Sequence, residues 1–235
     1  MKIEGPLIKG RFHSRPNRFL TVVEINGKLV QSHLPDPGRL KELLVPGAVL
    51  YLRPVSKEIP RKTRFTTIMV YHEGKFISLV STLPNQFVKE SIENGILPMF
   101  NNFKLIKPEI TVGKHRFDFL LEDSEGSPFY LEVKSVTFVE NGIAKFPDAV
   151  TARGTRHALA LSKLVEQGMD AGILFVCQRK DGNEFRPMWK RDLKFGNAIV
   201  NAKASGVFVW CITCSVTKES IKYFREIPVN LSPEL

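Results

Sequence analysis

Short apolar runs separated by turn residues fill the first third of the chain, and each run is predicted to be a β-strand. Between the second and third runs, Asn26-Gly27 is a strong two-residue hairpin signal. A helical turn is predicted over GRLKELL, after the Pro-rich HLPDPG. Five or six such strands in residues 1–83 predict a small β-barrel of the oligonucleotide-binding (OB) type. The runs are LIKGRF, RFLTVVEI, KLVQSHL, AVLYLRPV, FTTIMVYH and KFISLV.

The pattern changes near residue 84. Pro84-Asn85 offers a helix start, and the following NQFVKESIENGIL is predicted to be helical as far as Gly95. A longer helix is predicted from about Ala149 to Gln167, with Asp148 as its cap and Gly168 as its stop. A further helix is expected around residues 191–204. The predicted strands are FKLIKPEITV, HRFDFLLE, FYLEVKSVTF, GILFVCQ and GVFVWCITCSV. This order predicts an α/β domain over residues 84–235, with a mixed sheet flanked by helices.

Charge is distributed unevenly between these two parts. The chain of 235 residues has a formal net charge of +10. Residues 1–83 hold 14 Lys and Arg against 6 Asp and Glu, whereas the remainder holds 20 against 18. A basic excess concentrated in this way is typical of a protein that binds a polyanion, and it favours nucleic acid as the partner. The alternatives are a solubilising surface or the Lys and Arg enrichment of some thermophilic proteins.

Other features of composition exclude several classes of protein. No apolar run approaches the ~20 residues of a membrane helix, so no membrane partner is expected. The N-terminal MKIEGPLIKGRF lacks the apolar core of a signal peptide. Three cysteines in apolar segments favour reduced thiols and a cytoplasmic location over a disulfide framework. A homo-oligomer is compatible with the sequence.

The stretch FYLEVKSVTF raises a chemical question, because Glu132 and Lys134 interrupt an otherwise apolar strand. With HRFDFLLE it is predicted to form a hairpin centred on Glu125, which places Asp118 opposite Glu132. Lys134 would share that face, since strand side chains alternate. The opposite face would then be apolar. It would hold Phe117, Phe119 and Leu121 from one strand with Leu131 and Val133 from the other.

Two carboxylates this close are expected to share a proton or bind a cation. Mg²⁺ or Mn²⁺ is the predicted cofactor, because Mg²⁺ is held by one or two carboxylates and accepts phosphate oxygens. A third acid could come from Glu109 or Glu90, and Lys134 could act on an attacking water. The spacing Asp-x₁₃-Glu-x-Lys resembles the core of the PD-(D/E)-x-K nuclease superfamily, which implies a restriction-endonuclease-like domain. The alternative is a salt-bridged outer face of an edge hairpin.

Basic side chains are predicted near this hairpin. By the same register Arg116 would lie opposite Lys134, which favours carboxylates or a phosphate between the two cations. On the helix that follows, Arg153, Arg156 and His157 are spaced i, i+3 and i+4 and could contact phosphates. A solvated helix face is the alternative. In the barrel, the candidate phosphate contacts are Arg15, Arg18, Arg39, Arg61, Lys62 and Arg64.

Two other motifs carry no chemistry. Cys211-Ile-Thr-Cys214 lies in a strand, where positions i and i+3 face opposite sides, so the pair is not expected to bind a metal. Glycine-rich phosphate loops are absent, and no organic cofactor is predicted.

Four stretches in order make the resemblance more specific: HLPDPGRLKELLVPGAVL, KPEITVGKHRFDFLL, FYLEVKSVTF and FPDAVTARGTRHALAL. Over essentially the whole chain the sequence is similar to the sugar fermentation stimulation protein A (SfsA) family. The resemblance implies an N-terminal OB-like barrel and a C-terminal nuclease-like domain. It also implies DNA binding without marked sequence preference and a regulatory link to sugar catabolism.

The sequence therefore predicts a DNA-binding protein that grips backbone phosphates. The first alternative is an active nuclease in which Asp118 and Glu132 hold the metal and Lys134 acts on water. A transcription factor with base readout is disfavoured, because no helix-turn-helix or basic zipper pattern occurs.

Overall fold

The computed structural model describes residues 1–56 and 58–233. The chain divides into two compact units. One consists of Lys2–Leu83 together with Ser215–Lys222, and the other of Met1, Pro84–Cys214 and Tyr223–Leu235. The segment Ser215–Lys222, which the sequence analysis assigned to the C-terminal domain, thus groups with the N-terminal strands.

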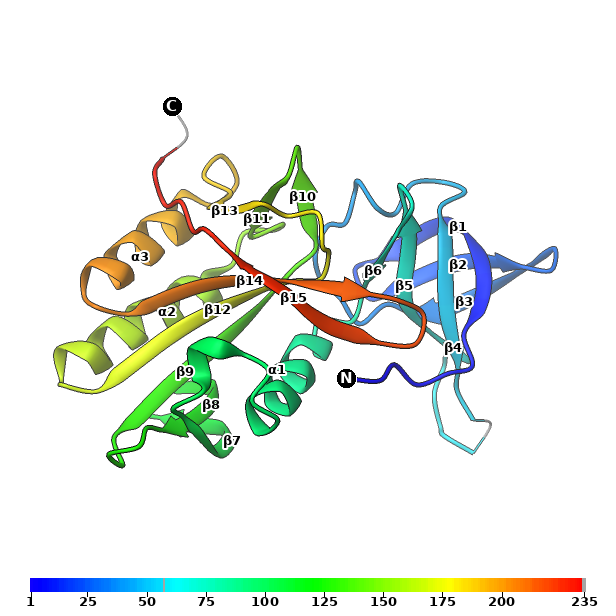
Figure 1. Ribbon diagram of the computed structural model, residues 1–235. Coiled ribbons are helices and arrows are strands. Elements are labelled where there is room, and N and C mark those ends of the chain that lie inside the picture. The colour runs from blue at the N-terminus through cyan, green and yellow to red at the C-terminus, as the bar shows by residue number, and fades with distance from the viewer. Residues whose placement is uncertain (57, 234–235) are drawn as a thin grey trace. The chain divides into compact units, whose positions relative to one another are not determined.

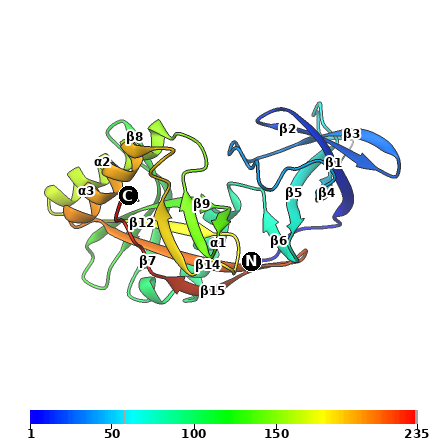
Figure 2. The same cartoon turned by 90° about the horizontal axis from the view of Figure 1, so that it is seen from above.

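The N-terminal unit is a closed β-barrel (Figures 1 and 2). Its strands follow the order β3-β2-β1-β4-β5-β6, and a further pairing of β3 with β5 closes the ring. The predicted hairpin is present, since Ile25 pairs with Lys28 around Asn26-Gly27, and both turn residues have positive φ. Leucines from the strands and from the turn after Leu40 fill the core. The strands are β1 (Ile8–Asn17), β2 (Leu20–Ile25), β3 (Lys28–His33), β4 (Val49–Pro54), β5 (Phe65–His72) and β6 (Lys75–Ser78).

Hydroxyl groups join the strands where the barrel closes. The Thr67 hydroxyl lies 2.9 Å from the hydroxyls of both Thr21 and Ser32, and all three side chains are fully buried. These residues come from β5, β2 and β3, so the cluster ties the closing strand to two others. Buried hydroxyls are tolerated in a core because they satisfy one another.

The C-terminal unit has an α/β architecture whose main sheet has the order β15-β14-β12-β9-β8-β7. Strand β12 runs parallel to both β9 and β14, whereas β7, β8 and β9 form an antiparallel meander. The predicted mixed sheet and its element order are confirmed. The elements of this sheet and its helices are α1 (Leu83–Glu93), the 3₁₀-helix η1 (Pro98–Phe100), β7 (Lys104–Val112), β8 (His115–Glu122), β9 (Pro128–Val136), α2 (Ala152–Glu166), β12 (Asp170–Cys177), α3 (Leu193–Ala204), β14 (Phe208–Val216) and β15 (Ile221–Ile227).

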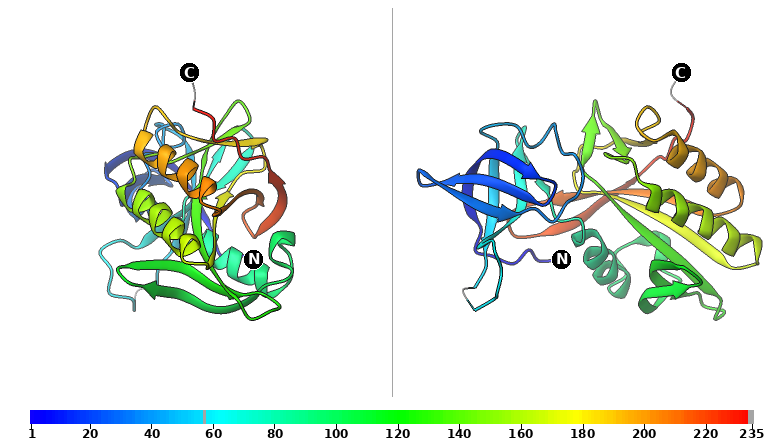
Figure 3. Two further views of the ribbon diagram at one scale, coloured as in Figure 1. Left: turned by 90° about the vertical axis from the view of Figure 1, so that its left-hand side faces the viewer. Right: turned by 180° about the vertical axis from the view of Figure 1, so that it is seen from behind.

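Helices cover both faces of the sheet (Figure 3). Helices α2 and α3 lie side by side on one face, where Leu161 and Phe195 pack against Ile173 and Phe175 of β12. On the opposite face Phe100 of η1 contacts the rings of Phe129 and Trp210. The central strand β9 is therefore covered on both sides, which explains why apolar residues occupy positions on both of its faces.

Several details differ from the sequence-based expectation. The N-cap of α2 is Thr151, whose hydroxyl accepts a hydrogen bond from Gly154 N, and not Asp148. The Asp148 carboxylate instead accepts a bond from Arg191 at 2.7 Å. Strand β15 and a small sheet were not predicted. That sheet has the order β10-β11-β13 and consists of β10 (Phe138–Glu140), β11 (Ile143–Phe146) and β13 (Glu184–Pro187). Across the described residues, none of the helices is both long and apolar enough to cross a membrane.

Replacement of Thr67 by Val tests the hydroxyl cluster. The substitution keeps the shape of the side chain but leaves the hydroxyls of Thr21 and Ser32 without this partner, so we expect the free energy of unfolding to fall by about 1–3 kcal/mol. Urea denaturation followed by circular dichroism measures the change. Replacing all three residues, as Thr21→Val, Ser32→Ala and Thr67→Val, should cost less than the sum of the single substitutions. Strict additivity would contradict the cluster.

Candidate functional site

The hairpin of β8 and β9 has the predicted centre. Leu120 pairs with Tyr130 and Leu121 with Phe129, as a turn centred on Glu125 requires. The ladder ends at the pair Phe119–Leu131, one residue before Asp118 and Glu132. These two acids therefore lie just beyond the last backbone pair, where the two strands begin to separate.

Beyond this point the strict alternation of β8 fails. The Phe117 ring lies 6.2 Å from Tyr130 and 5.7 Å from His157, so it packs on the α2 side of the sheet. The prediction that Phe117 shares a face with Phe119 and Leu121 is therefore wrong. The cause is local: pairing with β9 has ended, and Glu109 of β7, between two paired positions, has a φ of +53°.

Asp118 is half-buried, and its carboxylate joins the two strands of the hairpin beyond their last backbone pair. One carboxylate oxygen accepts a hydrogen bond from Val133 N at 2.7 Å, across the gap where the ladder has stopped. The other accepts one from the Asn85 amide of α1, also at 2.7 Å. Asp118 thus links β8, β9 and α1.

Glu132 is almost completely buried under α2, with a side-chain exposure of 3%. Its Oε1 accepts hydrogen bonds from the Lys134 ammonium and from His157 Nδ1, the latter at 2.6 Å. Its Oε2 is buried and has no hydrogen-bond partner among the described residues. One oxygen is thus satisfied twice, and the other is available to a ligand.

The two carboxyl groups have opposite pKa shifts. Burial raises the pKa of Asp118, and the negative charge of Glu132 raises it further, to about 6. Burial acts on Glu132 in the same direction. However, the hydrogen bond from His157 and the charge of Lys134 outweigh it, so the pKa of Glu132 is lowered from its ordinary value. The pair therefore has one firmly ionised member and one that is poised near neutrality.

The other predicted acids do not join this pair. The Glu109 carboxylate is exposed and lies 3.8 Å from Arg116, and the Glu90 carboxylate is 3.7 Å from the N-terminal amine. Among the described residues no group of three or more His, Cys, Asp or Glu side chains could hold a metal ion. Two carboxylates and an unpartnered oxygen on Glu132 nevertheless fit a hydrated divalent cation, which keeps several waters as ligands.

A basic pocket adjoins these residues in the C-terminal unit. It encloses about 570 Å³, and every described side chain that lines it is cationic or an imidazole. His157 belongs both to this pocket and to the hydrogen bond with Glu132, so pocket and carboxylate are neighbours. Arg116 is on the pocket wall, and no backbone pair joins it to Lys134. The lining residues are Lys114, His115, Arg116, Arg153, Arg156 and His157.

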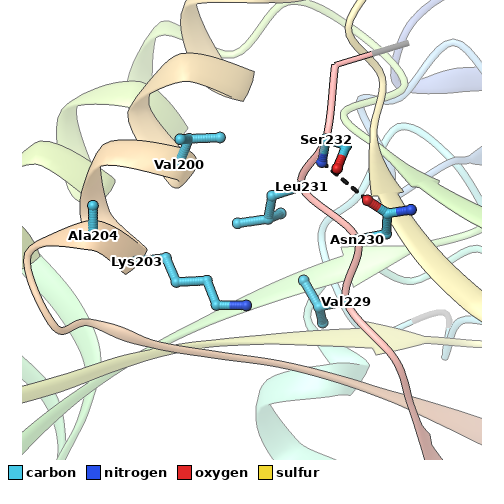
Figure 4. A pocket seen from close by; sticks show the side chains of 7 residues that line it. All are labelled: Val200, Lys203, Ala204, Val229, Asn230, Leu231 and Ser232. Carbon is cyan, nitrogen blue, oxygen red and sulfur yellow. Dashed lines mark hydrogen bonds between the residues drawn. The ribbon is translucent and has the colours of Figure 1, made fainter.

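A second pocket lies between α3 and the C-terminal segment (Figure 4). Leu231 points into it toward the helix, and Lys203 is the one charged side chain among its described lining residues. With its mostly apolar wall, this pocket resembles an imperfectly filled edge of the core more than a site with chemistry.

The predicted basic residues of the barrel differ in their availability. The Arg15 guanidinium donates to the backbone carbonyls of Arg39, Arg18 and Asp36, and so braces its own domain. Two further arginines, Arg61 and Arg64, also donate to groups of the barrel unit.

Three others are exposed and better placed to meet a ligand. Arg18 stacks on the Phe19 ring, with its guanidinium carbon 4.9 Å from the centroid. Arg39 and Lys62 form no side-chain hydrogen bond or ion pair within the described part of the chain.

Sequence reasoning missed three features of the site. Lys114 and His115 lie at the turn between β7 and β8, within the family-like stretch KPEITVGKHRFDFLL, but were not predicted as site residues. His157 was grouped with the exposed arginines of its helix, yet it is 5% exposed and bonded to Glu132. A usable signal was present, because Gly154, Ala158 and Leu161 mark the buried face of α2, and His157 lies on it.

Comparison with known families and structures gives consistent results. A family model described as the sugar fermentation stimulation protein RE domain matches residues 82–220. A second, the SfsA N-terminal OB domain, matches residues 14–79. The predicted fold class, an OB-like barrel followed by a nuclease-like α/β domain, is confirmed.

Individual relatives match along almost the whole chain. A sugar fermentation stimulation protein homolog from Clostridium tetani is 39% identical over 231 residues, which span 98% of this chain and 100% of the relative. One from Clostridium botulinum (strain Langeland) is 41% identical over the same shares of each chain. Among solved structures, Pyrococcus furiosus SfsA in complex with Ca²⁺ matches with a TM-score of 0.89 and 30% identity, covering 98% of each chain.

The coupling of the two carboxyl groups can be measured by NMR titration of the Asp118 carboxyl carbon. We expect a midpoint near pH 6 in the unmodified protein. Glu132→Gln removes a negative charge and should lower this midpoint, while burial keeps it above the ordinary value of 3.8. Glu122→Gln, on the same strand as Asp118, is the control. An unchanged midpoint in Glu132→Gln would contradict the placement of the pair.

The raised pKa of Asp118 also makes the free energy of unfolding depend on pH. Since the folded-state pKa of Asp118 is raised, its contribution to stability is fully present below pH 3.8 and is lost as the pH rises through about 6.

Proposed function

The chain belongs to the sugar fermentation stimulation protein (SfsA) family, and on this premise we propose that it binds DNA through the backbone phosphates, without marked sequence preference. The observation that carries the proposal is the pocket whose whole lining is cationic or imidazole, next to a pair of carboxylates. Phosphate contacts supply affinity and position but little sequence information.

The charge distribution supports this proposal independently of the pocket. The barrel unit holds the basic excess of the chain, and its Arg18, Arg39 and Lys62 are exposed. In a nucleic-acid complex such side chains neutralise phosphates and release condensed counterions. A link to the regulation of sugar catabolism follows from the family name alone and is part of the proposal on that ground.

Divalent-metal-dependent cleavage of DNA is a second candidate function, and the buried Oε2 of Glu132 favours it. This oxygen has no partner among the described residues, and the charge of Glu132 contributes to the raised pKa of Asp118. Mg²⁺ or Mn²⁺ is the proposed cofactor, and the relative from Pyrococcus furiosus was determined in complex with Ca²⁺. Asp118 and Glu132 would hold the cation, which would supply Lewis-acid stabilisation of phosphate charge.

The residues of the chain have separable roles in that reaction. His157 fixes one oxygen of Glu132 and thereby orients the carboxylate. Lys134 donates to the same oxygen and brings a positive charge to the site, where negative charge would develop on a phosphate. The arginines of the pocket would bind the phosphates of the DNA.

Binding should weaken steeply with salt. We expect the logarithm of the dissociation constant for duplex DNA of arbitrary sequence to rise linearly with the logarithm of salt concentration. The double substitution Arg39→Gln/Lys62→Gln should reduce the magnitude of the slope by about 2, because ~0.9 is lost for each phosphate contact. Fluorescence anisotropy measures both effects. Lys163→Gln, an exposed change on α2 outside the pocket, is the matched control. An affinity that does not respond to salt would refute the electrostatic proposal.

Cleavage is tested with plasmid and single-stranded DNA in Mg²⁺, in Mn²⁺ and in EDTA. If the protein is a nuclease, Glu132→Gln should abolish cleavage, since it removes a metal-binding charge, and Lys134→Gln should slow it by about 10²-fold or more. Glu122→Gln should cut normally. Thermal unfolding of each variant checks that the fold is intact. Binding without cleavage in either metal would eliminate this candidate and leave the binding function in place.

A further inference from the structure

The basic pocket contains more positive charge than its protein surroundings neutralise. Lys114, Arg153 and Arg156 are all exposed, and within the described part of the chain none of their side chains forms a hydrogen bond or an ion pair. Three unpaired cations around one cavity repel one another, and an anion in the cavity would remove that repulsion.

Two carboxylates are paired with lining residues, and neither lies on the three unpaired cations: Glu132 is bonded to His157 and Glu109 lies near Arg116. Glu109 lies 3.8 Å from Arg116, and both side chains are more than half exposed. Ion pairs this open to water have little strength. All described residues that line the pocket are basic or imidazole, so the lining itself supplies no negative charge to the three unpaired cations.

The start of helix α2 adds to the positive potential. Arg153 and Arg156 lie in the first two turns of this 15-residue helix, at its positive end. Thr151 caps the Gly154 amide, so the first turn is ordered and holds the arginine backbones in place.

The charge and size of the pocket fit a phosphate monoester better than a phosphodiester. A monoester has a charge of about −1.5 to −2 at neutral pH and three terminal oxygens that accept hydrogen bonds. A diester within a chain has a single charge. Guanidinium groups can bind such oxygens in pairs, and about 570 Å³ is enough for a phosphate with its attached nucleoside.

We propose that this pocket binds the terminal phosphate of a nucleic-acid chain and so selects chain ends. The proposal rests on the proposed DNA binding and names the part of the substrate that the site recognises. His157 gives the selection a consequence, because it lines the pocket and donates to Glu132. A chain whose end occupies the pocket would therefore contact the residue that orients Glu132.

The test compares oligonucleotides of one sequence that bear a 5′-phosphate, a 3′-phosphate or no terminal phosphate. Anisotropy without added metal measures their affinities for the full-length protein. We expect about tenfold tighter binding when one of the two ends is phosphorylated. The double substitution Arg153→Gln/Arg156→Gln should remove the difference, and so should the single change Lys114→Gln in the exposed turn. Lys163→Gln, on the same helix, should retain it.

Inorganic phosphate at constant ionic strength serves as the second probe. If the pocket recognises chain ends, phosphate should compete with the end-phosphorylated oligonucleotide and hardly affect the unphosphorylated one. Equal affinities for all three oligonucleotides would overturn the inference while leaving salt-dependent DNA binding intact. A circular single strand, which has no ends, is the control for binding along the chain. If the protein binds neither this circle nor any of the three oligonucleotides, the proposed function itself is overturned. Displacement by phosphate without any preference for phosphorylated ends would identify a site for free anions and overturn the inference.

Discussion

The buried carboxylate of Glu132 is the group on which the rest of the site depends. Removing a carboxylate from water costs several kcal/mol unless hydrogen bonds and opposite charge replace the solvent. Here Lys134 and His157 provide that replacement at Oε1. The bond to His157 also connects the centre of the sheet to α2. It therefore fixes the part of the helix that carries Arg153 and Arg156.

The site contains a negatively charged region and a positively charged region that adjoin one another. On the sheet, the two carboxylates are the proposed holders of a cation, and burial together with the charge of Glu132 raises the pKa of Asp118. On the helix and the β7–β8 turn, uncompensated cations surround a cavity that favours an anion. His157 belongs to both regions. A metal ion and a phosphate attract one another, so ligands in the two regions would reinforce each other's binding.

Local patterns in the sequence were sufficient to predict much of this arrangement. The apolar alternation and the turn DSEGS located the hairpin centre, because strand register depends on the turn between the strands. Helix α2 was predicted with Gly168 as its stop, although its cap is Thr151 and not Asp148. Long-range packing was harder to foresee. The partner of His157 is 25 residues away, and only the docking of α2 on β9 brings the two together.

The errors have physical causes of the same kind. Phe117 lies on the other side of the sheet from the one predicted, because the β8–β9 ladder ends early. At that point the Asp118 carboxylate, rather than a backbone carbonyl, accepts the hydrogen bond from Val133 N. Arg15 looked like a phosphate contact, but carbonyls from distant turns use its donors. In both cases the type of side chain was interpreted correctly, but its contacts depend on tertiary structure that the local sequence does not show.

The segment Ser215–Lys222 belongs to the barrel unit although it is distant from the other barrel residues in the sequence, and this limits how the two units can be separated. Lys2 bridges to Ser220, and the Lys218 ammonium lies 5.8 Å from the Tyr51 ring centroid, so the barrel includes residues from both ends of the chain. A fragment that stops at residue 83 would lose these contacts. The chain thus passes between the two units more than once, so a replacement of the segment before residue 84 alone would exchange only part of the barrel unit.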